Sequence, residues 1–178
     1  VLTTARLQLR QMRPSDAATL FAIKSNSLVT TPYGQEPHPS PDTTLAWMQR
    51  HRGFYEQRQG LYWCITFKNT ETVIGSCTFW NFDPGFHGAE IGYELHPDYW
   101  RRGIMSEAVS AALDYGFGAL GLHRIEAVML AENTASEQLV RKLGFAHEGT
   151  LRQREFFRGQ FHDQLYFGML STEWRTAT

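Results

Sequence analysis

The chain has 178 residues, of which 42% are hydrophobic, and its formal net charge at pH 7 is -1. This length and composition predict one domain over residues 1–178 with a hydrophobic core, and the near-zero charge argues against direct nucleic-acid binding or recruitment to an anionic membrane. We find no signal peptide and no apolar run long enough to span a bilayer, so we expect a cytoplasmic protein.

The two cysteines and seven histidines predict neither a disulfide scaffold nor a metal site. Cys64 and Cys77 flank a predicted hairpin almost symmetrically, so they either face each other across it or stay free thiols, as a reducing cytosol favours. We assign neither cysteine a role in chemistry. The histidines lack metal-ligand spacings, so we expect no structural metal.

Hydrophobic periodicity and the positions of Pro and Gly predict alternating strands and helices. The first half is predicted to contain a strand at Leu7–Gln11, a helix from Pro14 to Ile23, a loop from Ser27 to Pro41, a helix capped by Asp42 that reaches Tyr55, and a hairpin of strands Tyr62–Phe67 and Val73–Phe82. The second half is predicted to contain a turn at Pro84–Gly88, a strand at Ala89–Leu95, a helix at Ser106–Leu120, a strand at Arg124–Leu130, a helix at Thr134–Leu143, and strands Ala146–Phe157 and Phe161–Leu170. This order favours an α/β fold with a mixed sheet, helices on both faces, and a ligand site at the carboxyl end of a strand.

The segment from Glu94 to Ala108, ELHPDYWRRGIMSEA, joins a predicted strand to a predicted helix. A helix N-terminus has backbone N–H groups without intrahelical partners and carries the positive end of the helix dipole, so it suits a phosphate. Gly103 lets a ligand approach the backbone because it has no Cβ, and Arg101 and Arg102 add bidentate donors. We interpret this segment as a pyrophosphate-binding site, with an ordinary strand-to-helix turn as the alternative.

The stretch HPDYWRRGIMSEA at 96–108 resembles the acetyl-CoA loop of the GNAT N-acetyltransferases, and within them the RimJ/RimL-like branch, which acetylates protein N-termini. Trp100 and Met105 depart from the general pattern Q/R-x-x-G-x-G/A in ways that are usual in this branch. Further segments resemble the branch at 3–17, at 133–136 with 142–145, and at 155–163. The resemblance implies the GNAT acyl-CoA N-acyltransferase fold, with a twisted, mostly antiparallel sheet and a splayed strand pair.

The resemblance also implies acetyl-CoA as the cofactor and a set of contacts to it. In the family, backbone amides of the loop hold the pyrophosphate, and the strand before the loop pairs with the pantetheine arm. Asn133 would hydrogen-bond a pantetheine amide, or cap the following helix, or both. The implied cofactor-binding residues are Leu95, His96, Arg101, Arg102, Gly103, Ile104, Met105, Ser106 and Asn133.

The implied reaction is direct acyl transfer from a thioester to an amine, without a covalent acyl-enzyme. Many GNAT enzymes use a tyrosine seven residues after the asparagine as the acid, but this chain has Val140 there. The branch implies Ser136 as the group that serves the leaving sulfur, with a plain N-terminal helix serine as the alternative. Glu155 matches the carboxylate proposed as the base in RimL-like proteins, and Glu90 and Glu94 are rivals on one face of a strand.

We expect the acceptor pocket at the loop 27–41 and the turn 84–88, with Tyr33, Glu36 and His87 as candidate substrate-binding residues. The branch implies a protein or peptide N-terminus as the amine acceptor. The alternatives are a small amine, such as a polyamine, an aminoglycoside or an amino-acid-like compound, and a non-catalytic acyl-CoA-binding module. The apolar edge 156–161 is either core or the surface of a homodimer. We assign to core packing Tyr93, Phe117, Leu120, Leu143 and Phe145.

Overall fold

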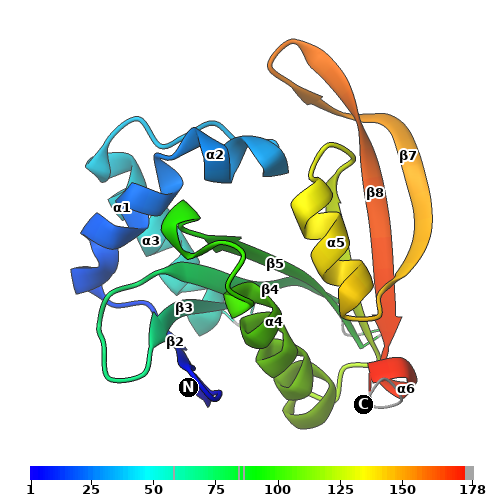
Figure 1. Cartoon of the computed structure of the whole chain (residues 1–178), viewed down its shortest axis with the longest axis horizontal. Helices are drawn as coiled ribbons and strands as arrows, with labels where there is room; N and C mark the ends of the chain where they lie inside the picture. The colour runs from blue at the N-terminus through cyan, green and yellow to red at the C-terminus, as the bar shows by residue number, and fades with distance from the viewer. Residues whose placement is uncertain (58, 84, 86, 175–178) are drawn as a thin grey trace.

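The computed structural model describes residues 1–57, 59–83, 85 and 87–174. Within these residues, eight strands form one sheet in the order β1-β2-β3-β4-β5-β6-β8-β7 (Figure 1). The strands are β1 (Leu2–Thr3), β2 (Leu7–Gln11), β3 (Leu61–Phe67), β4 (Gly75–Asp83), β5 (Gly88–Leu95), β6 (Arg124–Leu130), β7 (Ala146–Phe157) and β8 (Gln160–Leu170). Neighbours in this described sheet pair antiparallel except β5 and β6, which are parallel. The predicted mixed and mostly antiparallel sheet is therefore confirmed.

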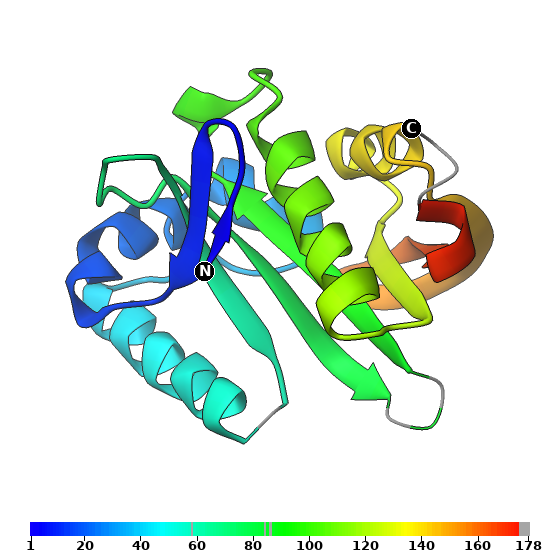
Figure 2. The ribbon, with the colours of Figure 1, turned by 90° about the horizontal axis from the view of Figure 1, so that it is seen from below.

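Helices cover both faces of the sheet (Figure 2). The helices on one face are α1 (Ala17–Lys24), the short α2 (Ser27–Thr30) and α3 (Pro41–Glu56), and those on the other are α4 (Ile104–Asp114), a π-helix (Tyr115–Ala119) and α5 (Thr134–Lys142). Short 3-10 helices occur at Pro14–Asp16, Thr31–Tyr33 and Pro97–Tyr99, and α6 (Ser171–Trp174) follows the last strand. No helix in the described chain is both long enough and apolar enough to cross a membrane.

Two hydrophobic cores lie on the two faces. The larger core packs α4 and α5 against the sheet and contains Cys77, and the smaller core packs α1 and α3 against the other face and contains Cys64. In the register of β3 with β4, Cys77 lies opposite Trp63, one residue away from Cys64. Because side chains alternate between the faces of a sheet, the two thiols point to opposite sides. Both thiols are free, and the alternative that they face each other is wrong.

The region predicted as a loop from Ser27 to Pro41 contains helical turns. The Asn26 side chain accepts a hydrogen bond from the Leu28 N–H at 3.0 Å and starts α2, while Gly34 ends the following 3-10 turn in the left-handed conformation, with φ 74°. Helix α3 is capped by Ser40, whose hydroxyl accepts from the Thr43 N–H at 3.3 Å, and not by Asp42, which lies in the first turn. Single helical turns are too short to show a hydrophobic period, so the sequence did not reveal them.

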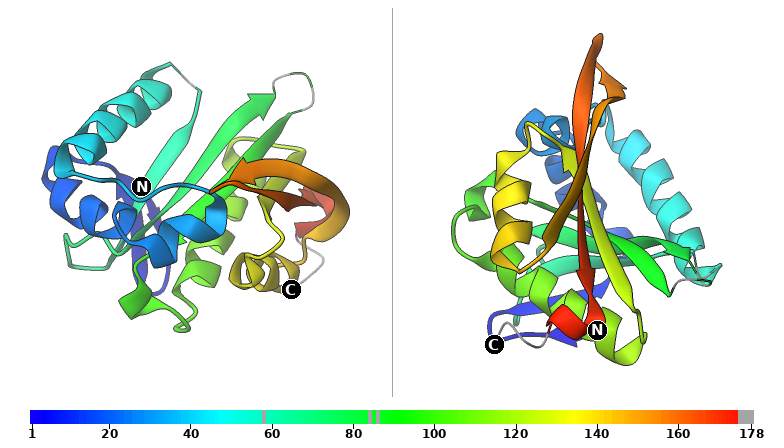
Figure 3. Two further views of the ribbon diagram at one scale, coloured as in Figure 1. Left: turned by 90° about the horizontal axis from the view of Figure 1, so that it is seen from above. Right: turned by 90° about the vertical axis from the view of Figure 1, so that its right-hand side faces the viewer.

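Other boundaries differ by a few residues. Helix α4 begins at Ile104 and changes to the π-helix after Asp114, and β1 and α6 are elements that the sequence did not predict. In the turn predicted at 84–88, Pro84 and Phe86 lie outside the described residues. The final hairpin turns at Arg158 and Gly159, both with positive φ, as a two-residue hairpin turn requires. This hairpin extends beyond the other strands (Figure 3).

Exposure corrects one core assignment and decides between the two alternatives for the hairpin edge. Leu120 is 37% exposed, so its assignment to the core is wrong. Phe156 and Phe161 are 60% and 63% exposed, with ring centroids 4.9 Å apart, so the edge of the hairpin is not core. Leu143 and Phe145 are buried in the larger core, as predicted.

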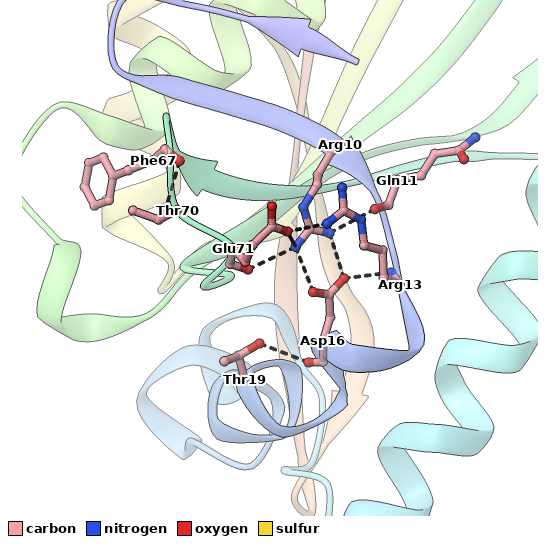
Figure 4. Close-up of polar contacts among 8 residues, drawn as sticks. All are labelled: Arg10, Gln11, Arg13, Asp16, Thr19, Phe67, Thr70 and Glu71. Carbon is pink, nitrogen blue, oxygen red and sulfur yellow. Dashed lines mark hydrogen bonds and ion pairs between the residues drawn. The ribbon is translucent and has the colours of Figure 1, made fainter.

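A buried ion pair fixes the start of α1 against the sheet (Figure 4). The Arg10 guanidinium on β2 donates two hydrogen bonds to the Asp16 carboxylate, both at 2.8 Å, and both side chains are 3% exposed. Asp16 also accepts from the Arg13 N–H at 2.7 Å, and Arg10 donates to the Glu71 carbonyl at 3.0 Å. The pair therefore ties β2, α1 and the β3–β4 connection together.

Asp16→Ala should lower the free energy of unfolding by about 3–5 kcal/mol, because it leaves the Arg10 charge buried without its partner. Urea denaturation at pH 7 measures this loss. Glu71→Ala is the matched control, since the Glu71 side chain is 75% exposed and an exposed ion pair contributes about 0–1 kcal/mol. Equal losses in the two variants would contradict this role for the buried pair.

Candidate active site

The site begins where β5 and β6 stop pairing. In the described strands, parallel pairing covers Gly88 with Arg124, Ala89 with Ile125 and Glu90 with Glu126, and then ends. Beyond this point β5 stays paired with β4 as far as Leu95, while β6 follows β8. The two strands therefore diverge in the middle of the sheet, which confirms the splayed pair.

The divergence leaves backbone groups of β5 facing the gap. The His96 N–H donates to the Ile74 carbonyl on the β4 side at 2.8 Å. Because backbone polar groups alternate in direction along a strand, those of Leu95 and Tyr93 point away from β4. The Leu95 carbonyl accepts from the Trp100 indole N–H at 2.8 Å. The Leu95 N–H and the peptide groups of Tyr93 therefore remain for a ligand in the gap.

A cleft of about 1450 Å³ runs from the N-terminus of α4 through this gap to the face covered by α1, α2 and α3. The sequence-predicted site residues that line it are Tyr33, Leu95, Arg101, Gly103, Ile104, Met105, Ser106, Asn133 and Ser136. The predicted site residues outside its lining are Glu36, His87, His96, Arg102 and Glu155. The structure thus brings most of the predicted cofactor residues into one cavity.

The N-terminus of α4 offers backbone donors. Gly103 occupies the N-cap position in the left-handed conformation, with φ 70°, and no side chain caps the helix. The first α-helical bond joins the Glu107 N–H to the Gly103 carbonyl at 3.1 Å. The amides of 104–106 precede it, so they have no intrahelical acceptor and can hold an anion.

A carboxylate beside these amides is neutralised by the start of the chain. Glu107 accepts hydrogen bonds from the Thr4 hydroxyl at 2.5 Å, the Arg6 N–H at 2.9 Å and the Arg6 side chain at 2.6 Å. Arg6 also donates to the Arg102 carbonyl at 3.0 Å. Burial opposes the ionisation of Glu107, but these donors outweigh it and hold its pKa below the ordinary value. The contacts fix the loop and offset a charge that would repel phosphate.

Ser136 and Tyr93 meet across the gap. The Tyr93 hydroxyl lies 2.7 Å from Ser136 Oγ, so this tyrosine contributes more than the core packing assigned to it. Asn133 Oδ1 accepts from the Ser136 N–H at 3.2 Å, which confirms the helix-cap role of Asn133. Val140 is fully buried in the larger core and is not among the residues that line the cleft, so an apolar side chain occupies the position of the usual tyrosine acid.

On the face of the sheet covered by α1 and α3, the Glu94 carboxylate accepts hydrogen bonds from several side chains. Its carboxylate accepts from Lys24 Nζ at 2.9 Å and from the hydroxyls of Tyr33 and Ser76, both at 3.0 Å, with the Tyr62 hydroxyl at 3.4 Å. Both charged groups are 7% exposed. Burial raises the pKa of Glu94, but Lys24 and the hydroxyl donors outweigh burial and hold the pKa below its ordinary value.

Glu90 shares this face with Glu94 but has a different environment. The β4–β5 register is regular from Gly75 to Trp80, so the two glutamates lie on one face, as predicted. Glu90 lines the cleft and accepts from the Asn81 side chain at 3.0 Å. Burial raises the pKa of Glu90 above its ordinary value, and the nearby Glu126 adds to the increase. This carboxylate is a better proton acceptor near neutral pH than Glu94.

Three predicted residues lie elsewhere. Glu155 pairs with His162 in the final hairpin. The Glu36 carboxylate accepts two hydrogen bonds from Arg158 at the hairpin tip, at 2.8 and 2.7 Å, and Arg158 lowers its pKa. His87 is exposed at the β4–β5 turn, where its carbonyl accepts from the His123 N–H at 2.7 Å.

The sequence missed the residues that complete the network around Glu94. Lys24, Tyr62 and Ser76 come from α1, β3 and β4, and their side chains meet only through the fold. Lys24 Nζ also lies 4.3 Å from the centroid of the Trp47 ring on α3. No local motif marks these residues, whereas Glu90, which also lines the cleft, was already a predicted rival for the base.

Lys24→Met should destabilise the fold in a pH-dependent manner. In the wild type, the contribution of Glu94 is present above its unfolded-state pKa of about 4.3 and is lost as the pH falls through its lower folded pKa. In the variant, the buried carboxylate loses its cation, so its pKa rises and the ionised form is penalised. We expect a loss of about 3–5 kcal/mol at pH 7 and a smaller loss at pH 5.

Urea denaturation of both proteins from pH 5 to pH 8 measures this dependence. Lys68→Met, at the exposed β3–β4 turn, is the matched control and should change stability little at any pH. A loss in Lys24→Met that stays constant with pH would refute the assignment of Lys24 as the partner of an ionised Glu94.

The chain resembles known proteins along most of its length. A family model described as "Acetyltransferase (GNAT) domain" matches residues 6–146. The chain is 40% identical over 163 residues to "Uncharacterized N-acetyltransferase YoaA" of Bacillus subtilis (strain 168), and the aligned region covers 92% of each chain. It is 29% identical over 178 residues to the ribosomal protein uS5-alanine N-acetyltransferase of Escherichia coli (strain K12), with 97% of this chain and 92% of that one covered.

A solved structure agrees with the fold. Spermidine N-acetyltransferase from Vibrio cholerae, in complex with CoA and spermine, has a TM-score of 0.85 and covers 95% of this chain and 98% of that chain. At 21% identity this likeness shows the fold alone. The match of the family model to most of the chain and the relative at 40% identity show that the protein belongs to the GNAT family of acetyltransferases and is an acyltransferase.

Proposed function

We propose that the protein transfers an acetyl group from acetyl-CoA directly to the α-amino group of a protein or peptide. The observation that carries this proposal is the continuous cleft, which joins the free amides at the start of α4 to a proton-accepting carboxylate on the opposite face of the sheet. A protein N-terminus as the acceptor is supported by the likeness to the uS5-alanine N-acetyltransferase.

The residues along the cleft fit CoA. The amides of 104–106 and the Arg101 side chain suit the pyrophosphate, and the unpaired backbone of β5 at Tyr93 and Leu95 suits an amide-containing arm. Asn133 uses its oxygen in the helix cap, so its NH₂ group remains to donate. When bound, acetyl-CoA supplies the activated thioester.

The face toward α1, α2 and α3 fits an acceptor with one positive charge. The charged residues that line the cleft there are Lys24, Glu90 and Glu94, and Lys24 already neutralises Glu94. Glu90, held by an amide, is left to meet a single ammonium group. Apolar side chains line the same cleft, including Phe54, Phe82 and Trp80, which is the β4 partner of Glu90. One charge among apolar walls suits an α-amine better than a polyamine.

The groups of this chain then take separate roles. Glu90 accepts the proton of the acceptor amine, directly or through water, because its raised pKa suits that exchange near neutral pH. The backbone N–H of Leu95 faces the gap and can donate to the developing oxyanion. Ser136 lines the cleft and serves the leaving sulfur. Glu155 stays the second candidate for the base, through the resemblance of its hairpin segment.

Thiol release from acetyl-CoA, measured with peptides that begin with Ala or Ser and with spermidine, tests the proposal. We expect turnover on the peptides and little on spermidine. Glu90→Gln should lower kcat/KM on the peptides by about 10²–10⁴, the usual contribution of a positioned base. In the wild type kcat/KM should rise with pH through an inflection above the ordinary pKa of a glutamate, and Glu90→Gln should abolish that inflection.

Glu155→Gln is the matched variant, since it makes the same change on the final hairpin. If Glu155→Gln loses activity and Glu90→Gln keeps it, the base is Glu155. Turnover on spermidine but not on the peptides would support an acetyltransferase activity and reject a peptide as the acceptor. Tight CoA binding without turnover on any amine would contradict the enzymatic proposal and favour a binding module.

A further inference from the structure

A hydroxyl pair bridges the two sides of the splay. Tyr93 lies on the part of β5 that has left β6, and Ser136 lies in the first turn of α5, which follows β6. Their oxygen atoms are 2.7 Å apart, and both residues line the cleft. A ligand arm that runs along β5 in the gap passes directly beside this contact.

The pair is not required to complete the helix. The Asn133 side chain already caps α5 by accepting from the Ser136 N–H, so Ser136 Oγ has no capping duty. The Tyr93 ring packs against the larger core, which holds the tyrosine without help from its hydroxyl. The contact between the two hydroxyls therefore spans the cleft, and neither the cap of α5 nor the packing of the tyrosine ring depends on it.

Chemistry assigns the direction of this hydrogen bond. Burial raises the pKa of Tyr93, so its phenol keeps its proton. A phenol is a stronger donor than an aliphatic hydroxyl, so Tyr93 donates to Ser136 Oγ. Ser136 then keeps its own proton for a third atom in the cleft. Successive hydrogen bonds polarise one another, and the phenol therefore makes the serine hydroxyl a better donor.

We propose that Tyr93 is a positioning residue that aims the Ser136 hydroxyl at the leaving sulfur. This inference rests on the proposed acetyl transfer. The C–N bond forms as the C–S bond breaks, the sulfur leaves with the electron pair of that bond, and the amine proton goes to the carboxylate. Neither hydroxyl loses its proton, because burial raises the pKa of Tyr93 above that of an ordinary phenol, and a thiol is more acidic than such a phenol or an aliphatic hydroxyl. The pair stabilises the thiolate by hydrogen bonding, and solvent protonates it later.

Titration of the thiol of bound CoA tests the proposal without an acceptor. The experiment follows the thiolate absorbance of bound CoA against pH, after subtraction of the absorbance of the protein alone. It compares the wild type with Tyr93→Phe, Ser136→Ala and the double variant. Ser136→Ala removes the hydrogen bond to the thiolate and Tyr93→Phe removes the contact that aims it, so each single variant should lower the acid dissociation constant of the thiol by about tenfold. The double variant should show no further decrease, since Tyr93 acts through Ser136.

Tyr115→Phe is the matched control, because Tyr115 also packs against the larger core but does not line the cleft. It should leave the titration unchanged. An unchanged thiol titration in Tyr93→Phe would overturn the inference, and so would effects of Tyr93→Phe and Ser136→Ala that add in the double variant. Thermal unfolding of Tyr93→Phe checks that the fold is kept.

Turnover separates this inference from the proposed function. Tyr93→Phe should lower kcat by about tenfold and leave KM for acetyl-CoA unchanged, since the hydrogen bond strengthens only as charge develops on sulfur. If the wild type turns over and Tyr93→Phe is fully active, the role of Tyr93 is rejected but the proposed acetyltransferase activity stands. Absence of wild-type turnover would reject the proposed function, and the thiol titration would still decide the inference.

Discussion

The structure depends on one interruption: β5 and β6 pair over three residues and then separate. A sheet that ended its hydrogen bonding there without a ligand would leave backbone donors and acceptors unpaired in its interior, which is costly. The separation of β5 from β6 is therefore a candidate binding site, because a ligand there can pair with these backbone groups. It leaves the backbone of β5 open to an extended ligand, and it connects the two faces of the sheet, as the proposed transfer from a cofactor on one side to an acceptor on the other requires.

Contacts far from the gap hold its two sides in place. Arg6 and Thr4, at the start of the chain, fix Glu107 and the loop before α4. The buried pair of Arg10 and Asp16 anchors α1, and α1 delivers Lys24 to Glu94 at its other end. The cofactor side thus presents free helix amides, while the acceptor side is internally neutralised except at Glu90. This division of charge fits the proposed binding of an anionic cofactor and a cationic amine in one cleft.

The sequence predicted those residues of the candidate cleft whose determinants are local. The strand, the loop around Gly103 and the start of α4 lie within one short segment, so their spacing alone indicated an anion site. The acceptor side could not be found in this way, because Lys24, Tyr62 and Ser76 converge on Glu94 from three different elements. Tyr93 was assigned to the core because its ring does pack there, and only the register of the splayed strand brings its hydroxyl to Ser136. The short turns between Ser27 and Tyr33 were missed because one helical turn has no measurable period.

Backbone amide NMR shifts on titration with CoA test the central claim most directly, because they report on each N–H that the splay leaves free. The account predicts large shifts for the amides of 104–106 and for Tyr93 and Leu95, with little change at the β4–β5 turn near His87. Saturable binding that shifts the turn and leaves the start of α4 and the end of β5 unchanged would contradict it.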